Sequence, residues 1–333
     1  MKDKKLFDKQ GRVINYLRLA VTDRCNLRCF YCMPETGIDF TPRTDLLSYE
    51  ELLRLTRVLS EMGINKLRIT GGEPFVRKDM MKFIASVNDL RRIEKINITT
   101  NGTITRAFIP DFKKVGIASV NLSLDTLDKD RFFEITRRDV LPEVLGTLDS
   151  LLSHDIPTKI NTVVMDGKNI QDITEMVKLT KDNPISVRFI EEMPFNGADA
   201  HYTSLKWDYN AILEHIRQTY PTIEKKVAPP HSTAALYQIP GFKGDIGIIA
   251  AYSRTFCGSC NRLRVTPKGV LRTCLYDSGT FNLRDFMRNG ATDEQLVSII
   301  QEAFDNRAKD GFEAEKKRHP DLGLNESMST IGG

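Results

Sequence analysis

The chain has 333 residues, of which 41% are hydrophobic and 28% charged, enough for one large α/β domain and a smaller one. Its 48 basic and 44 acidic residues are interspersed, so the formal charge of +4 gives no reason to expect a nucleic-acid or membrane partner. The first residues lack the apolar core of a secretory signal and no apolar run reaches the roughly 18 residues of a membrane span, so we expect a cytoplasmic protein.

The first expected strand, residues 17–22, leads into a loop that carries Cys25, Cys29 and Cys32. Thiolates bind zinc, copper(I) or iron–sulfur clusters, and the spacing Cys-x3-Cys-x2-Cys lets one loop surround a single inorganic group. A structural zinc site needs four ligands, and no fourth Cys or His lies near this loop. Three thiolates on a four-iron cluster would leave one iron open to a substrate or cofactor. Buried or zinc-bound cysteines are the alternative.

Beyond this loop the sequence alternates strand and helix patterns, which is typical of βα units around a parallel sheet. Ser48 and Glu51 form a capping box at the start of the first helix, and Gly63 ends that helix. Six strands with right-handed crossovers predict an α/β fold with an open, partial TIM-like barrel rather than a closed eight-stranded one. The strands are expected at residues 17–22, 66–70, 96–100, 118–125, 158–164 and 186–190.

The character of the sequence changes near residue 230. Pro229-Pro230 indicates a linker, and β-rich segments, a second cysteine triplet and a capped helix follow it. We therefore divide the chain into a barrel domain, residues 1–230, and a C-terminal domain, residues 231–333. The last twenty residues are polar, and we expect them to be loosely ordered.

A second motif, Gly71-Gly72-Glu73-Pro74, directly follows the second strand, at the carboxyl end where such barrels build active sites. A plain βα turn is the alternative for this motif alone. Together with the first cysteine triplet and the aromatic residue before its last cysteine, it resembles the radical S-adenosylmethionine (SAM) superfamily. The resemblance implies a first 4Fe-4S cluster on Cys25, Cys29 and Cys32, whose open iron binds SAM and whose reduced form cleaves SAM to a 5′-deoxyadenosyl radical. The SAM-contacting positions that it implies are Tyr31, Gly72, Ser123 and Met193.

Cations interrupt strands that are otherwise apolar. A barrel buries such strands on both faces, and an unpaired buried cation is costly, so each needs an anionic partner. A carboxylate of the chain could neutralise any single one, but several on different strands favour a polyanionic ligand that spans the barrel. These cations are Arg18, Arg68, Lys159 and Arg188.

The second triplet consists of Cys257, Cys260 and Cys274, with the spacing Cys-x2-Cys-x13-Cys. Three cysteines again suit a cluster with an open iron, whereas a structural zinc site and an auxiliary cluster for electron relay are the alternatives. Arg262 and Arg264 directly follow Cys260 and point to the same side if this segment is extended.

With the two glycines at residues 332 and 333, these features resemble the GTP 3′,8-cyclases of molybdenum cofactor biosynthesis over essentially the whole chain. The resemblance implies a second 4Fe-4S cluster that holds the purine, and a tail that reaches into the barrel. It implies conversion of GTP to (8S)-3′,8-cyclo-7,8-dihydroguanosine 5′-triphosphate, in which the adenosyl radical abstracts the ribose 3′ hydrogen. The GTP-contacting positions that it implies are Arg18, Arg68, Thr99, Lys159, Arg262 and Arg264.

Two other functions stay open at this point. One is a radical SAM enzyme that modifies a peptide. The arginines beside the second triplet and the diglycine end argue against this function. The other is a non-catalytic iron–sulfur redox protein, in which Gly71–Pro74 and the strand cations would have no role. The expected ligands are GTP and SAM, with an electron donor of unknown identity. The sequence names no acid or base residue and leaves the oligomeric state open, with a homodimer as one alternative.

Overall fold

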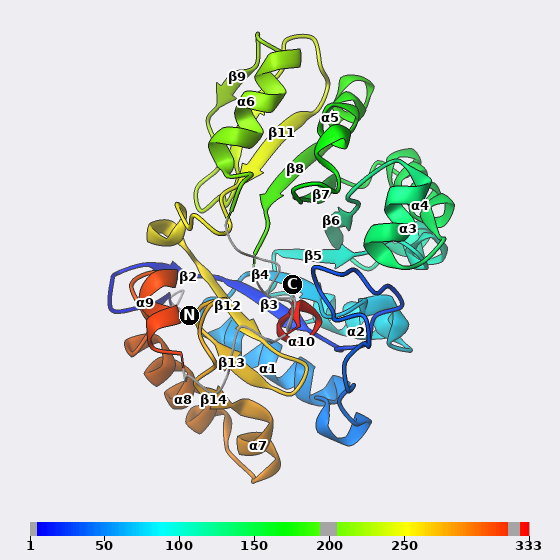
Figure 1. Ribbon diagram of the computed structural model, residues 1–333. Helices are drawn as coiled ribbons and strands as arrows, with labels where there is room; N and C mark the ends of the chain where they lie inside the picture. Colours follow the sequence, from blue (N-terminus) through cyan, green and yellow to red (C-terminus); the bar gives the residue numbers. More distant parts are fainter. Residues whose placement is uncertain (1–4, 194–204, 319–326, 333) are drawn as a thin grey trace.

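One open, mostly parallel sheet organises the computed structural model, which describes residues 5–193, 205–318 and 327–332. Six neighbouring strands of this sheet run parallel in chain order, and Figure 1 shows them following one another around a curved surface with helices outside it. The predicted α/β class with six consecutive parallel strands is therefore confirmed, with ends that differ by a few residues. The strands are β3 (Tyr16–Ala20), β4 (Lys66–Thr70), β5 (Lys95–Thr100), β6 (Ile117–Ser123), β7 (Thr158–Val164) and β8 (Ser186–Glu191).

Amphipathic helices connect these strands and bury their apolar faces against the sheet. They are α1 (Tyr49–Glu61), α2 (Met80–Asp89), α3 (Lys129–Thr136), α4 (Leu141–Ser153) and α5 (Ile173–Asp182). Between β5 and β6 the connection is a 3₁₀ helix, Thr105–Asp111, and Pro110 inside it cannot donate a backbone hydrogen bond.

The chain near and beyond residue 230 extends the same sheet at both edges. At one edge β11 pairs in parallel with β8 and is followed by β10 and β9, and at the other β12 pairs in parallel with β3 and is followed by β13 and β14. The division of the chain at residue 230 stays a prediction, and β9 precedes that position although it belongs to the added strands. These strands are β9 (Glu224–Lys226), β10 (Ala235–Gln238), β11 (Asp245–Ile249), β12 (Arg262–Val265), β13 (Val270–Arg272) and β14 (Phe281–Asn282).

C-terminal helices then pack back onto the barrel. The Arg54 Nε donates to an Asp293 carboxylate oxygen at 2.8 Å, and Arg288 forms an ion pair with Glu51 at 2.7 Å, so α1 is tied to α7 and α8. A small hairpin of β1 (Leu6–Phe7) and β2 (Val13–Ile14) lies at the other end of the chain. The remaining helices are α6 (Tyr209–Thr219), α7 (Leu283–Arg288), α8 (Asp293–Asp305), α9 (Gly311–Lys316) and α10 (Met328–Ile331).

The end of the chain differs from the expectation of loose order where the structure describes it. Ser329 and Ile331 in α10 are only 2% and 1% exposed, and Figure 1 shows α10 beside β3. The Ser327 hydroxyl donates to the Cys32 carbonyl at 2.6 Å. This polar side chain therefore attaches the segment to the first cysteine loop instead of facing solvent. Residues 319–326 and Gly333 lie outside the described residues.

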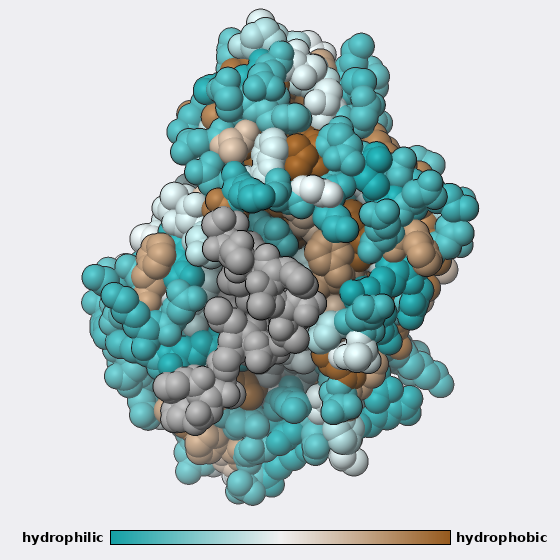
Figure 2. Space-filling view, viewed as in Figure 1, coloured by the Kyte–Doolittle hydropathy of each residue, from teal (hydrophilic) through white to brown (hydrophobic). Residues whose placement is uncertain are grey.

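The visible surface is mostly hydrophilic. Figure 2 shows apolar residues scattered over this face in small separate groups, which is normal for a folded domain. Within the described ranges, no helix has both the length and the apolar composition that crossing a membrane requires.

The capping box at the start of α1 generates a stability prediction. The Ser48 hydroxyl accepts from the Glu51 amide at 3.2 Å, and the Glu51 carboxylate accepts from the Ser48 amide at 2.7 Å. Loss of an N-cap side chain typically costs about 1 kcal/mol, so Ser48→Ala should lower the free energy of unfolding by about that amount in a denaturant titration. Ser298→Ala, at an exposed position inside α8, is the matched control and should change it by less than about 0.5 kcal/mol. Equal effects of both changes would contradict the capping role.

Candidate active site

A cavity of about 610 Å³ lies inside the barrel, a volume in the range of small-molecule sites. Its lining includes residues from every one of the six parallel strands and from the segments around the second cysteine triplet. The cavity brings together all predicted SAM and GTP positions and the first triplet, whose roles remain predictions. They are Arg18, Cys25, Cys29, Tyr31, Cys32, Arg68, Gly72, Thr99, Ser123, Lys159, Met193, Arg262 and Arg264.

The first cysteine loop turns tightly, so that its thiols face the cavity. The amides of Cys32 and Met33 both donate to the Cys29 carbonyl at 3.0 Å, and the Asn101 side chain donates to the Cys25 sulfur at 3.6 Å. Burial raises the pKa of Cys32 to about 12 and that of Cys29 well above its usual value. Buried thiolates therefore need a bound cation, and iron would supply it, so this donor set fits an iron–sulfur cluster.

The backbone after β4 supports this loop directly. The Gly72 amide donates to the Thr22 carbonyl at 2.7 Å, and the Glu73 amide donates to the Arg24 carbonyl at 2.8 Å. A Cβ on Gly72 would lie 2.3 Å from that Arg24 oxygen, so glycine is required because the cysteine loop occupies the space. The Glu73 carboxylate is fully buried and accepts from the Asn101 amide at 2.7 Å, which makes it a brace between β4 and β5.

Two further predicted SAM positions have polar side-chain contacts. The Tyr31 hydroxyl donates to one Asp125 carboxylate oxygen at 2.8 Å, and the Val163 amide donates to the other at 2.8 Å. Burial raises the pKa of Asp125 to about 6 although both of these hydrogen bonds lower it. The Tyr276 hydroxyl donates to the Ala251 carbonyl at 2.7 Å and lies 3.5 Å from the Met193 sulfur, so a predicted SAM position contacts the segment that follows the second triplet.

Three adjacent strands repeat a pattern of polar residue, leucine and arginine. Because side chains alternate along a strand, the leucines face the helices, fully buried, while the other two residues face the cavity. The register places Arg264, Arg18 and Arg68 opposite one another on β12, β3 and β4. The three repeats are Tyr16-Leu17-Arg18, Lys66-Leu67-Arg68 and Arg262-Leu263-Arg264.

The crowding of these cations is visible in their electrostatics. Burial, followed by the charge of Arg264, lowers the pKa of Arg18 well below its usual value. Burial and the charge of Arg188 lower the pKa of Lys159 to about 8. Burial alone would raise the pKa of Tyr16, but the charges of Arg68 and Arg18 lower it to about 7. Like charges at paired positions of neighbouring strands destabilise a sheet. The positively charged side of the cavity formed by β12, β3 and β4 therefore favours a polyanionic ligand.

Unpartnered polar atoms line the same cavity. Buried polar groups are normally hydrogen-bonded, and each one left unsatisfied costs about 1–3 kcal/mol, so a cluster of them indicates a ligand or water site. Within the described residues, those without a protein partner include Asn121 Oδ1, Asn161 Oδ1, Ser186 Oγ, Arg188 Nε and Asp245 Oδ1.

The second triplet lies beside the cavity rather than in its lining, although Phe256, Asn261 and Leu275 next to its cysteines do line it. Burial raises the pKa of Cys274 to about 12. Burial would also raise that of Cys260, but the charges of Arg262 and Arg307 lower it overall. In the part of the chain that the structure describes, no three His, Cys, Asp or Glu side chains group around a single metal ion.

Sequence reasoning missed some residues of this site. Tyr16 and Lys66 face the cavity, and their position two residues before Arg18 and Arg68 was a usable signal. Arg188 was recognised as a buried cation but was not assigned to the GTP site. Asn101 and Arg307 stand in no motif, so only the fold brings them to the sulfur atoms of the two triplets.

Comparisons with known proteins identify relatives of the chain. Residues 19–180 match the Radical SAM superfamily model, and residues 185–312 match Molybdenum Cofactor Synthesis C. A Clostridium perfringens protein named GTP 3′,8-cyclase is 41% identical over 317 residues, which cover 93% of this chain and 96% of that protein. Molybdenum cofactor biosynthesis protein 1 of Drosophila melanogaster is 40% identical over 96% of this chain and 57% of its own length. The chain thus spans about half the length of several curated relatives that it matches.

Solved structures share the fold at low sequence identity. Streptococcus suis SuiB bound to S-adenosylmethionine superposes with a TM-score of 0.57 at 16% identity, over 84% of this chain and 67% of that one. Methylornithine synthase (PylB) gives a TM-score of 0.54 at 15% identity, over 86% of each chain. These likenesses establish the fold alone.

The contact between Gly72 and the cysteine loop generates a second prediction. Gly72→Ala should displace the loop, because the added Cβ meets backbone atoms that cannot move without Cys25. We expect the iron content of anaerobically reconstituted protein to fall, with circular dichroism unchanged. Gly258→Ala, in the loop of the second triplet, is the control because open space surrounds its Cβ position. Full iron content in the Gly72→Ala protein would show that the loop tolerates the displacement.

Proposed function

Because the chain belongs to the GTP 3′,8-cyclase family of the radical SAM superfamily, we propose that it cyclises GTP with SAM as the radical source. The product is (8S)-3′,8-cyclo-7,8-dihydroguanosine 5′-triphosphate, a precursor in molybdenum cofactor biosynthesis. One observation carries the proposal: a single cavity is lined both by the three thiols of the first triplet and by rows of strand cations.

The first cluster and SAM would supply a 5′-deoxyadenosyl radical, and the residues of the chain would hold and orient the reactants. Cys25, Cys29 and Cys32 would bind the cluster. Tyr31, fixed by Asp125, would lie against the adenine of SAM. The other SAM positions are the backbone at Gly72, together with Ser123 and Met193. Holding the reacting carbon of SAM near the ribose 3′ hydrogen is the main task, because near-attack geometry accounts for much of such catalysis.

The positively charged side of the cavity, formed by β12, β3 and β4, would bind the triphosphate. Its charges are already desolvated and lie in register, so a polyanion that enters gains several charge-assisted hydrogen bonds without reorganising the strands. The residues that we assign to GTP are Arg18, Arg68, Thr99, Lys159, Arg262 and Arg264, to which the structure adds Tyr16, Lys66 and Arg188 as candidates.

We assign a second 4Fe-4S cluster to Cys257, Cys260 and Cys274, where it would hold the guanine base. Thiols of raised pKa at Cys257 and Cys274, in each case chiefly through burial, fit a site that iron completes. An electron donor must also reduce the first cluster.

The tail belongs to the same proposal. Arg264 Nη1 donates to the Gly332 carbonyl at 2.7 Å, so the tail contacts a proposed GTP residue. Gly332 has φ of 76°, and a Cβ there would lie 2.9 Å from that of Ala20, so no other residue fits this position well. We propose that residues 327–332 help to close the cavity and to orient Arg264.

A peptide-modifying radical SAM enzyme is the second candidate, since SuiB has also been solved with its precursor peptide and shares the fold. A peptide gives no reason for two rows of arginine, lysine and tyrosine across three adjacent strands inside the barrel. The buried cations therefore favour the nucleotide.

Turnover of anaerobically reconstituted protein with dithionite tests the proposal. Formation of 5′-deoxyadenosine from SAM should rise when GTP is added, with cyclised nucleotide as the second product. Cys29→Ala should abolish SAM cleavage, whereas Cys260→Ala should keep the first cluster and SAM binding but lose cyclisation. A Cys260→Ala enzyme that makes the product at the parent rate would remove the second cluster from the mechanism. The absence of SAM cleavage by the parent would favour a redox protein.

A charge-removal series tests the nucleotide site. Lys159→Gln should weaken GTP binding by about 1.5–3 kcal/mol, or roughly tenfold to a hundredfold, and leave SAM binding nearly unchanged, because one charge-assisted contact is lost. Isothermal titration measures both affinities. Lys95→Gln is the matched control, since Lys95 is exposed at the start of β5. Equal GTP affinities for the two variants would exclude Lys159 from the site.

A further inference from the structure

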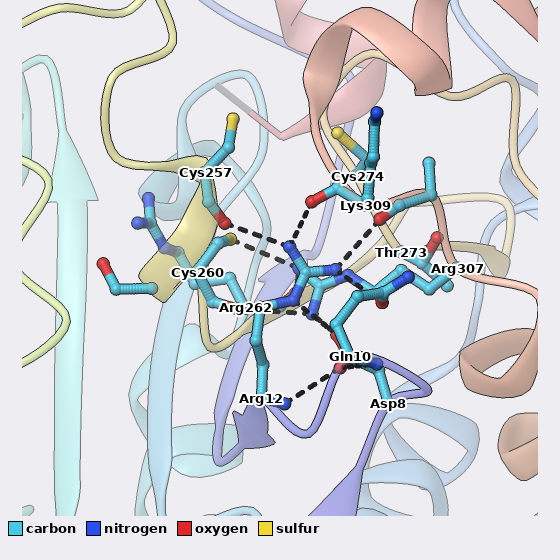
Figure 3. A network of polar contacts seen from close by, with 12 residues as sticks. Asp8, Gln10, Arg12, Cys257, Cys260, Arg262, Thr273, Cys274, Arg307 and Lys309 are labelled. Carbon is cyan, nitrogen blue, oxygen red and sulfur yellow. Dashed lines mark hydrogen bonds and ion pairs between the residues drawn. The ribbon is translucent and has the colours of Figure 1, made fainter.

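A buried ion-pair network surrounds the second cysteine triplet and joins three distant parts of the chain. Figure 3 shows Asp8 and Arg12 from the amino-terminal hairpin, Cys257 and Cys260 from the cysteine loop, and Arg307 from the segment after α8. One Asp8 oxygen pairs with Arg12 Nε at 2.6 Å and with Arg307 Nη1 at 3.0 Å. The Asp8 side chain is fully buried and that of Arg307 is 3% exposed, so solvent screens this network little.

The guanidinium of Arg307 reaches the cysteine loop at several points. Its Nη1 donates to the Cys260 carbonyl at 3.2 Å, and its Nη2 donates to the Cys260 sulfur at 3.3 Å and to the Arg262 carbonyl at 3.3 Å. The planar fork of arginine allows one side chain to hold a carboxylate, two carbonyls and a sulfur together. A proposed cluster ligand is thus fixed from a residue that stands in no sequence motif.

Arg12 makes a similar set of contacts without touching sulfur. Its Nη1 donates to the carbonyls of Cys257 at 3.0 Å and Lys309 at 2.7 Å, and its Nη2 donates to that of Ala308 at 2.9 Å. The two arginines therefore brace the same loop from the same carboxylate. They differ in that only Arg307 places a charged N–H group on a cysteine sulfur.

A charged donor at a ligand sulfur affects the two redox states of a cluster unequally. Reduction by one electron adds a negative charge that is spread over the sulfurs, so hydrogen bonds and nearby positive charge stabilise the reduced state. The effect is strong in a buried site, where the effective dielectric constant is low.

We infer that Arg307 is a positioning residue of the second cluster, which orients Cys260 and raises the reduction potential of that cluster through its N–H···S contact. The inference rests on the proposed function, because it requires that the second triplet bind a cluster. Asp8 has a supporting part, since it holds the guanidinium of Arg307 in the orientation that reaches the sulfur.

Redox titration of the full-length, anaerobically reconstituted protein, followed by electron paramagnetic resonance, tests the inference. The signal of the second cluster is assigned with Cys29→Ala, which should retain only that cluster. In Arg307→Gln we expect its midpoint potential to fall, with the equilibrium shifted about tenfold, or about 59 mV for one electron. The potential of the first cluster should not move.

Arg12→Gln is the matched control, because it removes one cation and several loop contacts from the same network but no sulfur contact. Its potential should change less than that of Arg307→Gln. Arg307→Lys keeps the positive charge but has one donor nitrogen in place of the guanidinium fork, so it should give an intermediate potential. It replaces Arg307→Gln in the test if the Arg307→Gln protein loses the second cluster.

The outcomes separate the inference from the proposed function. Two clusters in the parent, with a second-cluster potential that is equal in the parent, Arg307→Gln and Arg307→Lys, would overturn the inference alone. An equal shift in Arg12→Gln and Arg307→Gln would also overturn it, because the sulfur contact would then have no specific effect. A parent protein with iron for only one cluster, all of which is lost in Cys29→Ala, would overturn the second-cluster assignment and the inference together.

Discussion

Burial of positive charge on facing strands is the constraint on which the rest of this structure depends. Arg264, Arg18 and Arg68 occupy matched positions on three adjacent strands, and a sheet gains nothing from like charges in that arrangement. The leucines between the cavity-facing residues compensate in part, because they bury fully under the helices. The outer face thus contributes the apolar burial that holds the barrel together, while the inner face concentrates positive charge.

The C-terminal tail contacts the segments of both cysteine triplets. Ser327 donates to the carbonyl of Cys32 in the first triplet, while Gly332 accepts from Arg264, which lies between Cys260 and Cys274 of the second. Tyr276 follows Cys274, and its hydroxyl contacts the sulfur of Met193, a predicted SAM position. These contacts hold the two cysteine segments in a fixed relative position, which suits the proposed chemistry of two bound reactants.

Local patterns predicted the parts of this molecule that local forces determine. The six barrel strands follow from alternating strand and helix signals, and the cap of α1 follows from Ser48 and Glu51. The pairing of β11 with β8 and of β12 with β3 could not be predicted, because short strands carry no record of which edge they join. Similarly, the first triplet and the strand cations could be predicted from the sequence, because the residue types and their spacing identify them. The bond from Arg307 to Cys260 joins residues 47 positions apart and exists only after the C-terminal helices dock.

The concentration of positive charge on the inner face also gives a physical reason for the placement of the predicted GTP residues on strands rather than loops. A charged side chain on a mobile loop would point into solvent and would have to lose its bound water when the nucleotide bound. On β3, β4 and β12 the backbone pairing keeps the charged side chains directed into the cavity. The free-energy cost of dehydrating them is offset during folding by burial of the apolar core outside the sheet. The same reasoning applies to Tyr16, whose pKa of about 7 reflects the surrounding cations, although burial opposes the shift. An anionic ligand that neutralises these cations removes the cause of the low pKa, so its arrival would return Tyr16 toward the neutral phenol. The cavity is therefore preorganised for anionic charge, and the folding energy of the outer layer is what maintains it.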